Sequence, residues 1–507
     1  MQVRTQTLTL LAVSVFTAAA QNPAVTVNVD ANAKRRPISP FIYGTNLAEA
    51  AALADLNAPL NRYGGNNTTR YNWQQNADNR AFDWYFESIP LGPAVAGERG
   101  DTFISTTKGA GAQPMMTIPM IGWVAKLGPN RDKLASFSIQ KYGPQTGADW
   151  QWFPDAGNGI RQSGGYVTGN DPNDANVPNS SSFQKLWVQQ LLSKWGGAAN
   201  NGLRYYILDN EHSLWFSTHR DVQPVGPHHT EIRDRVLEYA AMIKSVDPAA
   251  KVVGPEEWGW SGFVFSGYDQ QVGAQNGWSK FPDREAMGNM DYIPWLLQQW
   301  KAAHPLDVFS LHWYPQGGEY SNDVSQSAQL LRNRSTRALW DPTYKDPTWI
   351  NDYVQLIPRM RNWMNQYYDP ATPIAITEYS WGADNHINGA TAQADILGIF
   401  GREGLDMGTR WTTPDATTPT YKAMKMYRNY DGNKSTFGET SVSATVPNPD
   451  NLSAFAAERA SDGAMTVMVI SKVLSGNTPV TINLSNFAGI GTAQAFQLTS
   501  ANNITRL

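Results

Sequence analysis

The sequence predicts an α/β protein, namely a (β/α)8 TIM barrel with a small C-terminal all-β sandwich domain that the N-terminal strand joins. Between about residues 35 and 430, short β-rich segments alternate with longer helical or irregular stretches, as in repeated βα units. After about residue 440, apolar residues alternate along short runs that turns separate, which is typical of strands facing a core. We therefore expect the barrel over residues 36–430, and the sandwich from residues 22–35 together with 431–507.

Residues 1–20 are predicted to be a secretory signal peptide. Arg4 supplies a positive charge, Leu8–Phe16 is a short apolar stretch, and Ala18–Ala20 provides small residues for cleavage before Gln21. The apolar stretch is far shorter than the roughly 20 residues that a membrane span requires, so no membrane partner is expected. Export of a chain without cysteine is typical of a bacterial secreted protein, and the predicted location is extracellular.

Eight short segments of the central region have the composition of barrel strands. They are residues 41–44, 60–63, 115–118, 205–208, 251–254, 308–311, 374–377 and 407–410. The alternative is an open doubly wound sheet, but no Gly-x-Gly-x-x-Gly follows the first segment, which argues against its nucleotide-binding form. The Gly-, Asn- and Pro-rich stretch 143–178 is predicted to be a loop over the active face rather than a linker.

Helices are predicted between several of these strands. Apolar residues recur every three or four positions over 232–243, and Asp247-Pro248 ends that helix before the next strand. The same pattern recurs over 396–400, where Gly404 is placed as a C-terminal cap. In the terminal regions, residues 25–29, 464–470 and 480–484 alternate or are β-rich and predict the strands of the sandwich.

The composition excludes several classes of protein and favours a neutral, ring-shaped ligand. A formal net charge of −4, without a basic run, argues against a nucleic-acid partner. The absence of cysteine excludes disulfides, thiol nucleophiles and thiolate metal sites. The 19 Trp and 21 Tyr exceed what core packing normally needs, and their flat apolar faces suit a pyranose ring.

Motifs for a catalytic metal or a serine nucleophile are absent from the sequence. The 7 His form neither His-x-x-x-His nor His-Glu-x-x-His, so no cofactor is expected to be required for catalysis. A structural Ca²⁺ among Asp and backbone oxygens stays open, although no Asp-x-Asp-x-Asp-Gly loop marks a site, and the metal ligands are unknown. Gly-x-Ser-x-Gly is also absent, which argues against a serine esterase.

Two carboxylates are the candidate catalytic residues. Glu211 follows the fourth predicted strand and Glu378 follows the seventh, so both belong to the carboxyl-terminal face of the barrel, where chemistry takes place in this fold. Hydrolysis of a glycosidic bond needs such a pair, and a separation of about 5–5.5 Å would indicate a retaining mechanism. The alternative for either residue alone is a solvated or ion-paired Glu at a strand end.

Longer motifs surround both residues and continue along the chain. They are Ile207-Leu208-Asp209-Asn210-Glu211 followed by Leu214-Trp215; Ala375-Ile376-Thr377-Glu378-Tyr379; Arg62-Tyr63-Gly64-Gly65-Asn66 with Tyr71-Asn72-Trp73; Leu339-Trp340-Asp341-Pro342-Thr343-Tyr344; Gly389-Ala390-Thr391-Ala392-Gln393-Ala394-Asp395; and Leu397-Gly398-Ile399-Phe400-Gly401. In this order, from about Pro37 to the end of the chain, the sequence resembles glycoside hydrolase family 44, a family of clan A. Motifs of this length are highly specific.

The resemblance implies a barrel plus a β-sandwich and retaining endo-β-1,4-glucanase activity, sometimes extending to xyloglucan, xylan or mannan. It implies that Glu211 is the acid/base and Glu378 the nucleophile, and Asn210 resembles the amide that holds the sugar 2-hydroxyl in related barrels. Two departures stand out. His212 replaces the Pro that usually follows the acid/base, and the family's sandwich normally runs some tens of residues further, which predicts an incomplete small domain.

Supporting roles follow from the chemistry of the pair. The acid must keep its proton near the operating pH, whereas the nucleophile must stay ionised and needs a cation or hydrogen-bond donor nearby. Arg62 is the candidate cation; the alternative is that it forms a structural ion pair in the barrel mouth. Tyr314 is the candidate hydrogen-bond donor; the alternative is that it only lines the wall of the cleft. A protonated His212 would lower the pKa of Glu211 and shift the pH optimum to more acidic values.

Nine Trp residues lie in or near the loops that follow strands, and about half of them are expected to line the cleft. The candidates for substrate binding are Trp73, Trp123, Trp215, Trp258, Trp313, Trp381 and Trp411; the other two are Trp84 and Trp260. For each of them, core packing is at least as common a role as sugar stacking. The expected partner is a β-linked polysaccharide, and the chain is expected to act as a monomer. A polysaccharide-binding protein that has lost turnover is a further alternative.

Overall fold

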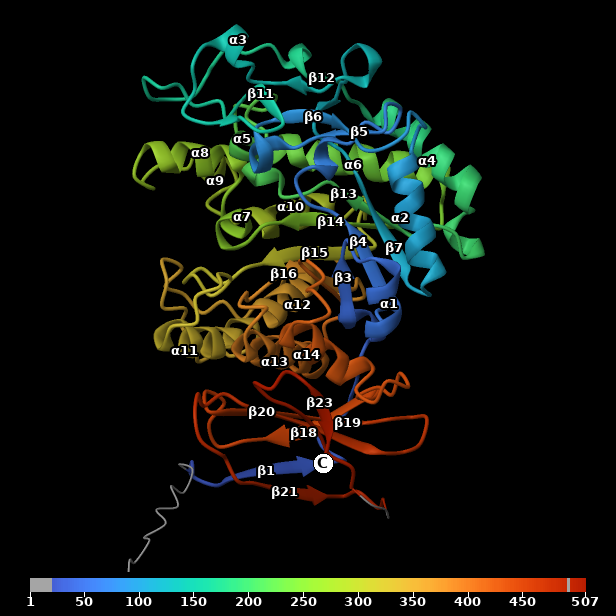
Figure 1. Cartoon of the computed structure of the whole chain (residues 1–507), viewed down its shortest axis with the longest axis vertical. Coiled ribbons are helices and arrows are strands. Elements are labelled where there is room, and N and C mark those ends of the chain that lie inside the picture. Colours follow the sequence, from blue (N-terminus) through green and yellow to red (C-terminus); the bar gives the residue numbers. More distant parts are fainter. Residues whose placement is uncertain (1–20, 490–492) are drawn as a thin grey trace, which may run out of the picture.

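The computed structural model describes residues 21–489 and 493–507. The predicted signal peptide, residues 1–20, lies outside the described residues. Figure 1 shows the barrel and its extensions above an all-β region that contains the C-terminal strands and β1. None of the described helices is long and apolar enough to span a membrane.

Eight parallel strands close into a barrel in the order β13-β14-β15-β16-β17-β3-β4-β7, which confirms the predicted fold class. Their bounds are β3 (Gly44–Asn46), β4 (Leu60–Tyr63), β7 (Gln113–Ile118), β13 (Tyr205–Leu208), β14 (Lys251–Glu257), β15 (Val308–Trp313), β16 (Ile374–Tyr379) and β17 (Met407–Arg410). The first strand begins later than predicted, because Pro40–Tyr43 forms a 3₁₀ helix. Ser39 caps that helix and Pro40 begins it, and both residues favour a helical start.

Helices surround the strands and bury their apolar faces against them. The longer ones are α1 (Ala50–Leu56), α2 (Glu98–Gly109), α4 (Ser181–Trp195), α6 (His229–Val246), α8 (Gly267–Gln275), α10 (Tyr292–Trp300), α11 (Gln326–Ser335), α12 (Leu356–Tyr367), α13 (Ile387–Glu403) and α14 (Pro419–Arg428), and the shorter ones are α3 (Ile139–Tyr142), α5 (Trp215–Thr218), α7 (Trp260–Val264) and α9 (Pro282–Ala286). The predicted stripe of α6 is buried, and Asp247 follows its last residue. Gly404 caps α13 with a φ of +70°, as its position after the apolar repeat predicts.

A lobe of short strands extends from two neighbouring barrel strands, β4 and β7 (Figure 1). It contains β5 (Ala77–Asn79), β6 (Glu87–Pro90) and β9 (Leu134–Ala135) in one sheet, β8 (Trp123–Ala125) paired with β12 (Asn176–Pro178), and β10 (Ala148–Asp149) paired with β11 (Phe153–Gly157). The stretch 143–178, predicted as a loop, therefore contributes strands to this lobe. Because these segments follow the carboxyl ends of β4 and β7, the lobe rises on the face where the barrel carries its chemistry.

The all-β region combines strands from both ends of the chain. Its sheet has the order β20-β19-β18-β1-β21, with β2 paired to β18. The bounds are β1 (Val25–Asp30), β2 (Arg36–Pro37), β18 (Thr440–Thr445), β19 (Leu452–Glu458), β20 (Met465–Ser471) and β21 (Val480–Ser485), and β22 (Phe496–Leu498) pairs separately with β23 (Ile504–Arg506). The N-terminal strand joins this region as predicted, antiparallel to β18 and parallel to β21.

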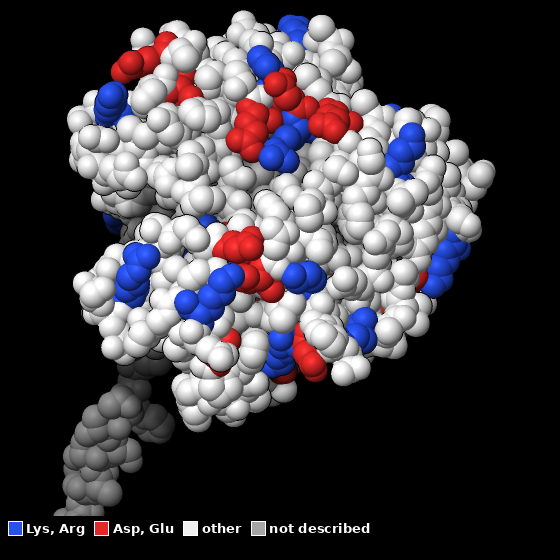
Figure 2. All heavy atoms as spheres, turned by 90° about the horizontal axis from the view of Figure 1, so that it is seen from above, with Lys and Arg blue, Asp and Glu red and all other residues white. Residues whose placement is uncertain are grey.

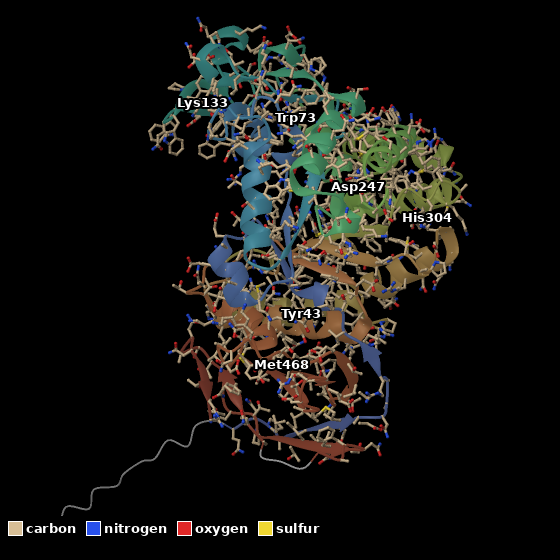
Figure 3. The ribbon with its side chains drawn as sticks, turned by 90° about the vertical axis from the view of Figure 1, so that its right-hand side faces the viewer. Tyr43, Trp73, Lys133, Asp247, His304 and Met468 are labelled. Atoms are coloured by element: carbon tan, nitrogen blue, oxygen red, sulfur yellow. The ribbon has the colours of Figure 1, made fainter. Side chains whose placement is uncertain are left out.

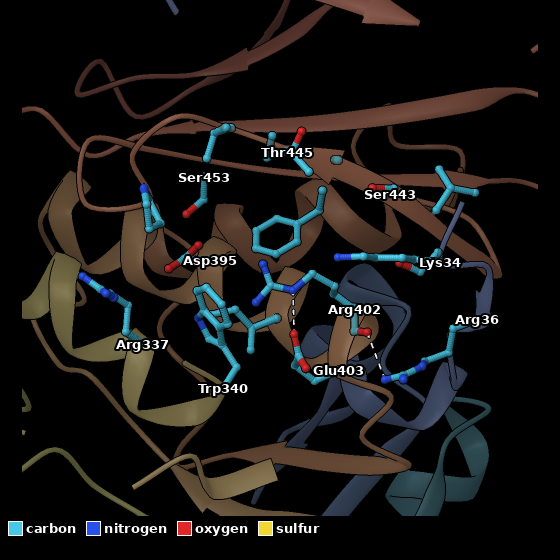
Figure 4. Close-up of a pocket in the computed structure, with 18 of the residues that line it drawn as sticks. Lys34, Arg36, Arg337, Trp340, Asp395, Arg402, Glu403, Ser443, Thr445 and Ser453 are labelled. Atoms are coloured by element: carbon cyan, nitrogen blue, oxygen red, sulfur yellow. Dashed lines mark hydrogen bonds and ion pairs between the residues drawn. The ribbon is translucent and has the colours of Figure 1, made fainter. Parts of the chain in front are cut away.

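A cavity of about 640 Å³ lies where the sheet meets α13 (Figure 4). Several of its charged groups are paired within the protein: Lys472 lies 2.6 Å from Asp395, and Arg402 lies 2.7 Å from Glu403. The Arg402 guanidinium also covers the ring of Trp340 at 4.1 Å. The cavity therefore belongs to the joint between the two regions, and its lining includes neither candidate catalytic carboxylate.

Candidate active site

The two candidate carboxylates meet at the carboxyl ends of β13 and β16. One oxygen of Glu211, one oxygen of Glu378 and a ring nitrogen of His312 all lie within 4.8 Å of one another. Glu378 belongs to β16, whereas Glu211 lies beyond β13, where its backbone has a φ of +43° and its N–H donates to the carbonyl oxygen of Glu256 at 3.0 Å. The Glu211 side chain is 14% exposed, so the pair is sheltered but still reaches solvent.

Each oxygen of Glu378 accepts one hydrogen bond. Arg62, fully buried in β4, donates from Nη1 to Oε1 at 2.6 Å, and the Tyr314 hydroxyl donates to Oε2 at 2.9 Å. A guanidinium and a phenol that donate to the same carboxylate hold it in one orientation. The structure thus brings the candidate nucleophile Glu378 together with Arg62 and Tyr314, the two residues that the sequence proposed as its supporting groups.

Asn210 lies beside this group but is itself held by Arg62. Its Oδ1 accepts from Nη2 of Arg62 at 2.9 Å, and its Nδ2 donates to Oδ1 of Asn66 at 3.4 Å. Its backbone carbonyl accepts from the indole N–H of Trp215 at 3.0 Å. The amide is therefore fixed in one orientation next to the acid/base candidate.

Sequence reasoning did not assign a role to His312 and Glu256, which complete the site. Nδ1 of His312 lies 2.9 Å from Oε1 of Glu211, and Nε2 lies 3.0 Å from Oε2 of Glu256. Glu256 also pairs with Nη2 of Arg62 at 2.8 Å and accepts from the Thr377 hydroxyl at 2.9 Å. Both residues end barrel strands, so the rule that strand ends converge could have marked them.

The charges around His312 and Glu256 determine which of the two side chains holds a proton at neutral pH. Burial alone would lower the pKa of His312, but the charge of Glu378 and the hydrogen bonds to Glu211 and Glu256 raise it to about 9. Burial would raise the pKa of Glu256, but the charge of Arg62 and the hydrogen bond from His312 lower it to about 2. At neutral pH, His312 is therefore a cation that donates through both nitrogens, and Glu256 is an anion.

The pKa of Glu211 is raised above its ordinary value. Burial is the main cause and the charge of Glu378 adds to it, while the hydrogen bond from His312 opposes both. Glu211, with its raised pKa, has the property that a general acid requires, and Glu378, which accepts from two donors, is oriented as a nucleophile must be.

Glu211, His312 and Glu378 are also close enough to share a metal ion. Each of them already has a partner within the protein: Glu211 contacts His312, His312 also contacts Glu256, and Glu378 pairs with Arg62. The three side chains therefore suit proton transfer and nucleophilic attack better than metal coordination.

The predicted stacking role does not fit four of the seven Trp candidates, because their rings are buried in the hydrophobic core. They are Trp73, Trp215, Trp313 and Trp381. Trp381, for example, donates its indole N–H to the Ser335 hydroxyl at 2.9 Å. Trp123, Trp258 and Trp411 are half-buried and keep part of their surface exposed. The sequence placed all seven near strand ends, but only packing decided which rings face inward.

The structure also corrects the expected role of His212. Its ring is fully buried, and Nε2 lies 2.9 Å from the Tyr292 hydroxyl and 2.7 Å from Oε1 of Glu257. The histidine that contacts Glu211 is His312, from β15, and not the sequence neighbour.

Comparison with known proteins places this site in a family. The family model described as glycoside hydrolase family 44 matches residues 77–317. The crystal structure of a bifunctional glucanase-xylanase from a metagenome library is 68% identical, covers 96% of this chain and 95% of that chain, and has a TM-score of 0.95. The xyloglucanase of Paenibacillus polymyxa, described as a member of family 44, is 29% identical over 96% of this chain and 95% of that chain, with a TM-score of 0.78.

Curated relatives agree with these structures. Endoglucanase A of Paenibacillus lautus is 32% identical over 91% of this chain. The chain spans 65% of the length of that protein and 35% of the length of a second curated relative. The family model, the identity to these relatives and the barrel with its paired carboxylates lead to one conclusion: the chain belongs to glycoside hydrolase family 44.

Proposed function

We propose that the protein is a retaining endo-β-1,4-glycanase that cleaves internal bonds of an uncharged polysaccharide, with Glu211 as acid/base and Glu378 as nucleophile. The observation that carries this proposal is the approach of the two carboxylates to within 4.8 Å. That separation matches the roughly 5–5.5 Å of retaining enzymes and is too short for an inverting enzyme, which must fit a water molecule between the carboxylates.

In the first step, Glu378 attacks the anomeric carbon while Glu211 gives its proton to the departing glycosidic oxygen. The bond between the two sugars breaks, and an ester joins the sugar to Glu378. The raised pKa of Glu211 keeps that proton available. Arg62 and Tyr314 hold the Glu378 oxygens at 2.6 and 2.9 Å and keep the carboxylate oriented for attack.

In the second step, Glu211 acts as a base. It takes a proton from a water molecule, whose oxygen attacks the anomeric carbon and releases Glu378. When Glu378 becomes an ester it loses its negative charge, so the electrostatic cause that raised the pKa of Glu211 weakens. The same residue can therefore serve as acid in the first step and as base in the second.

The proposed substrate is a cellulose-type β-glucan. On the face shown in Figure 2, acidic and basic side chains lie next to one another in small mixed groups. Large areas without Lys, Arg, Asp or Glu separate these groups. Such a surface suits a neutral polymer better than a charged one. Xylan is a second candidate, because the relative that is 68% identical is described as a glucanase-xylanase.

Export and a monomeric state belong to the same proposal. A polysaccharide is too large to enter a cell, so the predicted signal peptide over residues 1–20 would bring the enzyme to its substrate. Glu211, Glu378, Arg62 and His312 all come from one chain, so the described site needs no second copy.

The test is a substrate panel with matched variants. The protein should release reducing ends from carboxymethyl cellulose, and the first product should carry the β-anomer in NMR spectra. Glu378→Gln and Glu211→Gln should each lose several orders of magnitude in turnover, whereas Glu285→Gln, an exposed residue of α9, should keep wild-type activity. Wild-type turnover in Glu378→Gln, or an α-anomer as the first product, would contradict the proposal.

A further inference from the structure

A second cavity, of about 300 Å³, lies in the lobe that follows β4 and β7. It is lined by Arg80, Trp84, Glu87, Ile89, Lys133, Asp149 and Trp152. Figure 3 places Lys133 at the edge of this lobe, at the opposite end of the molecule from Met468 in the all-β region. The cavity is large enough for a small polar ligand.

Two exposed indole rings form one wall of this cavity. Trp84 is 41% exposed and Trp152 is 57% exposed, and their ring centroids lie 5.5 Å apart with the planes tilted by 48°. Leaving this much aromatic surface in water is unfavourable, so adjacent exposed rings beside polar groups indicate a binding surface. Flat rings of this kind match the apolar face of a pyranose.

Asp149 contacts the ring of Trp84 and the backbone of Trp152. This buried residue accepts from the indole N–H of Trp84 at 3.4 Å and from the backbone N–H of Trp152 at 3.2 Å. Trp84 comes from the segment after β4, and Trp152 comes from the segment after β7. The wall is therefore assembled from two distant parts of the sequence and is held ready before any ligand arrives.

The polar groups of the cavity offer both donors and acceptors. Arg80 and Lys133 supply cations, with Arg80 3.1 Å from Asp78 and Lys133 3.9 Å from Glu87. Burial and the hydrogen bond with Asp149 raise the pKa of Glu87 to about 8, so Glu87 is mostly protonated at neutral pH. Mixed donors and acceptors without a strong net charge suit the hydroxyl groups of a neutral sugar.

A continuous series of contacts connects this wall to the reactive carboxylates. Asn210, which precedes Glu211, donates to Asn66 at 3.4 Å, and Asn66 donates to both oxygens of Asp83 at 3.2 and 3.1 Å. Trp84 follows Asp83 directly in the chain. A polymer that lies across Glu211 and Glu378 and continues along this side would reach the two rings.

We infer that Trp84 and Trp152 form a distal subsite that holds one sugar ring of the bound polysaccharide, away from the bond that is cleaved. This inference rests on the proposed function. It assigns a specificity-determining role to Trp152, and it adds Trp84 to the residues that bind substrate rather than fill the core.

The test compares long and short substrates. For Trp152→Ala and Trp84→Ala, kcat/KM on cellohexaose should fall about tenfold, which corresponds to about 1.4 kcal/mol of lost binding. On p-nitrophenyl β-cellobioside, which is too short to span the site, the same variants should keep wild-type kcat/KM. Trp150→Ala is the matched control, because Trp150 is 77% exposed in the same segment but does not line the cavity.

Direct binding separates failure of the subsite from failure of the proposed function. In Glu378→Gln, adding Trp152→Ala should weaken cellohexaose binding about tenfold by calorimetry, whether or not the wild type turns over this substrate. Three results would overturn the inference: unchanged binding, an equal loss of activity on both substrates, or a loss confined to adsorption on insoluble polysaccharide. A wild type that cleaves no β-1,4-glycan would instead contradict the proposed function.

Discussion

Nδ1 of His312 lies 2.9 Å from Oε1 of Glu211, so the candidate acid/base receives its hydrogen bond from a buried cation. The opposite ring nitrogen contacts Glu256, whose own pKa is lowered to about 2. The charge of Glu378 and the hydrogen bonds to Glu211 and Glu256 keep His312 protonated, and His312 limits how far the pKa of Glu211 rises. The proton affinity of Glu211 therefore depends on its burial, on the hydrogen bond from His312 and on the charge of Glu378.

Replacement of His312 by Gln should move the alkaline limb of the pH–activity profile to higher pH. The hydrogen bond from the His312 cation lowers the pKa of Glu211, so its removal leaves Glu211 protonated up to a higher pH. A shift of about one pH unit is expected for the loss of an adjacent charge. The measurement is kcat/KM against pH, with Tyr314→Phe as the comparison, because Tyr314 contacts Glu378 and not Glu211. An alkaline limb that stays in place or moves down would contradict the prediction.

Replacement of Tyr314 by Phe should reduce kcat/KM by roughly 10- to 100-fold, because hydrogen bonds to charged groups contribute about 1.5–3 kcal/mol. The phenol donates to Oε2 of Glu378 at 2.9 Å, and Phe keeps the ring without the donor. The control is Tyr320→Phe, since Tyr320 is 58% exposed and its variant should match the wild type. Steady-state kinetics that show no loss for Tyr314→Phe would mean that the hydroxyl does not support the nucleophile.

Glu256 and His312 together should contribute most to folding stability between about pH 4.5 and 6.5. Glu256 has a folded pKa of about 2 against an ordinary 4.5, so its contribution is present above pH 4.5 and is lost as the pH falls towards 2. His312 has a folded pKa of about 9 against 6.5, so its contribution is present below pH 6.5 and is lost as the pH rises towards 9. The Glu256 shift corresponds to about 3 kcal/mol.

Thermal unfolding at a series of pH values checks this prediction. Glu256→Gln should flatten the acid side of the curve, and His312→Gln should flatten the alkaline side. Curves for both variants that run parallel to the wild type would show that other groups cause the pH dependence.

Replacement of Gly398 by Ala should destabilise the joint between α13 and the all-β region. Within a helix this change normally stabilises by about 0.5–1 kcal/mol, but a Cβ at Gly398 would lie 2.2 Å from the ring of Phe455. We expect a net loss of about 1–3 kcal/mol in the free energy of unfolding, as for other overpacked cores. Gly109→Ala, at the end of α2, is the control, because nothing lies within 4 Å of its added Cβ. Phe455→Leu in the Gly398→Ala background should restore part of the loss.

The barrel strands and the approach of the two candidate carboxylates could be predicted from the chain alone. Seven of the eight predicted barrel segments lie within strands of the structure, because local apolar runs and their spacing are properties of neighbouring residues. The first segment differs by a few residues, since Ser39 and Pro40 start a 3₁₀ helix there. Closure of the barrel then brings residues 211 and 378 together. For this reason, their positions at the carboxyl ends of two predicted strands indicated that their side chains would meet.

The tertiary structure alone decided which histidine contacts Glu211 and which Trp rings are buried. Residue 212 follows Glu211 in the chain, yet its ring turns towards Tyr292 and Glu257, and His312 from another strand takes the place beside Glu211. Likewise, burial of Trp215 and exposure of Trp152 result from segments that meet only after folding. Periodicity along the chain fixes the elements, but contacts between residues a hundred positions apart fix side-chain direction, burial and proton affinity.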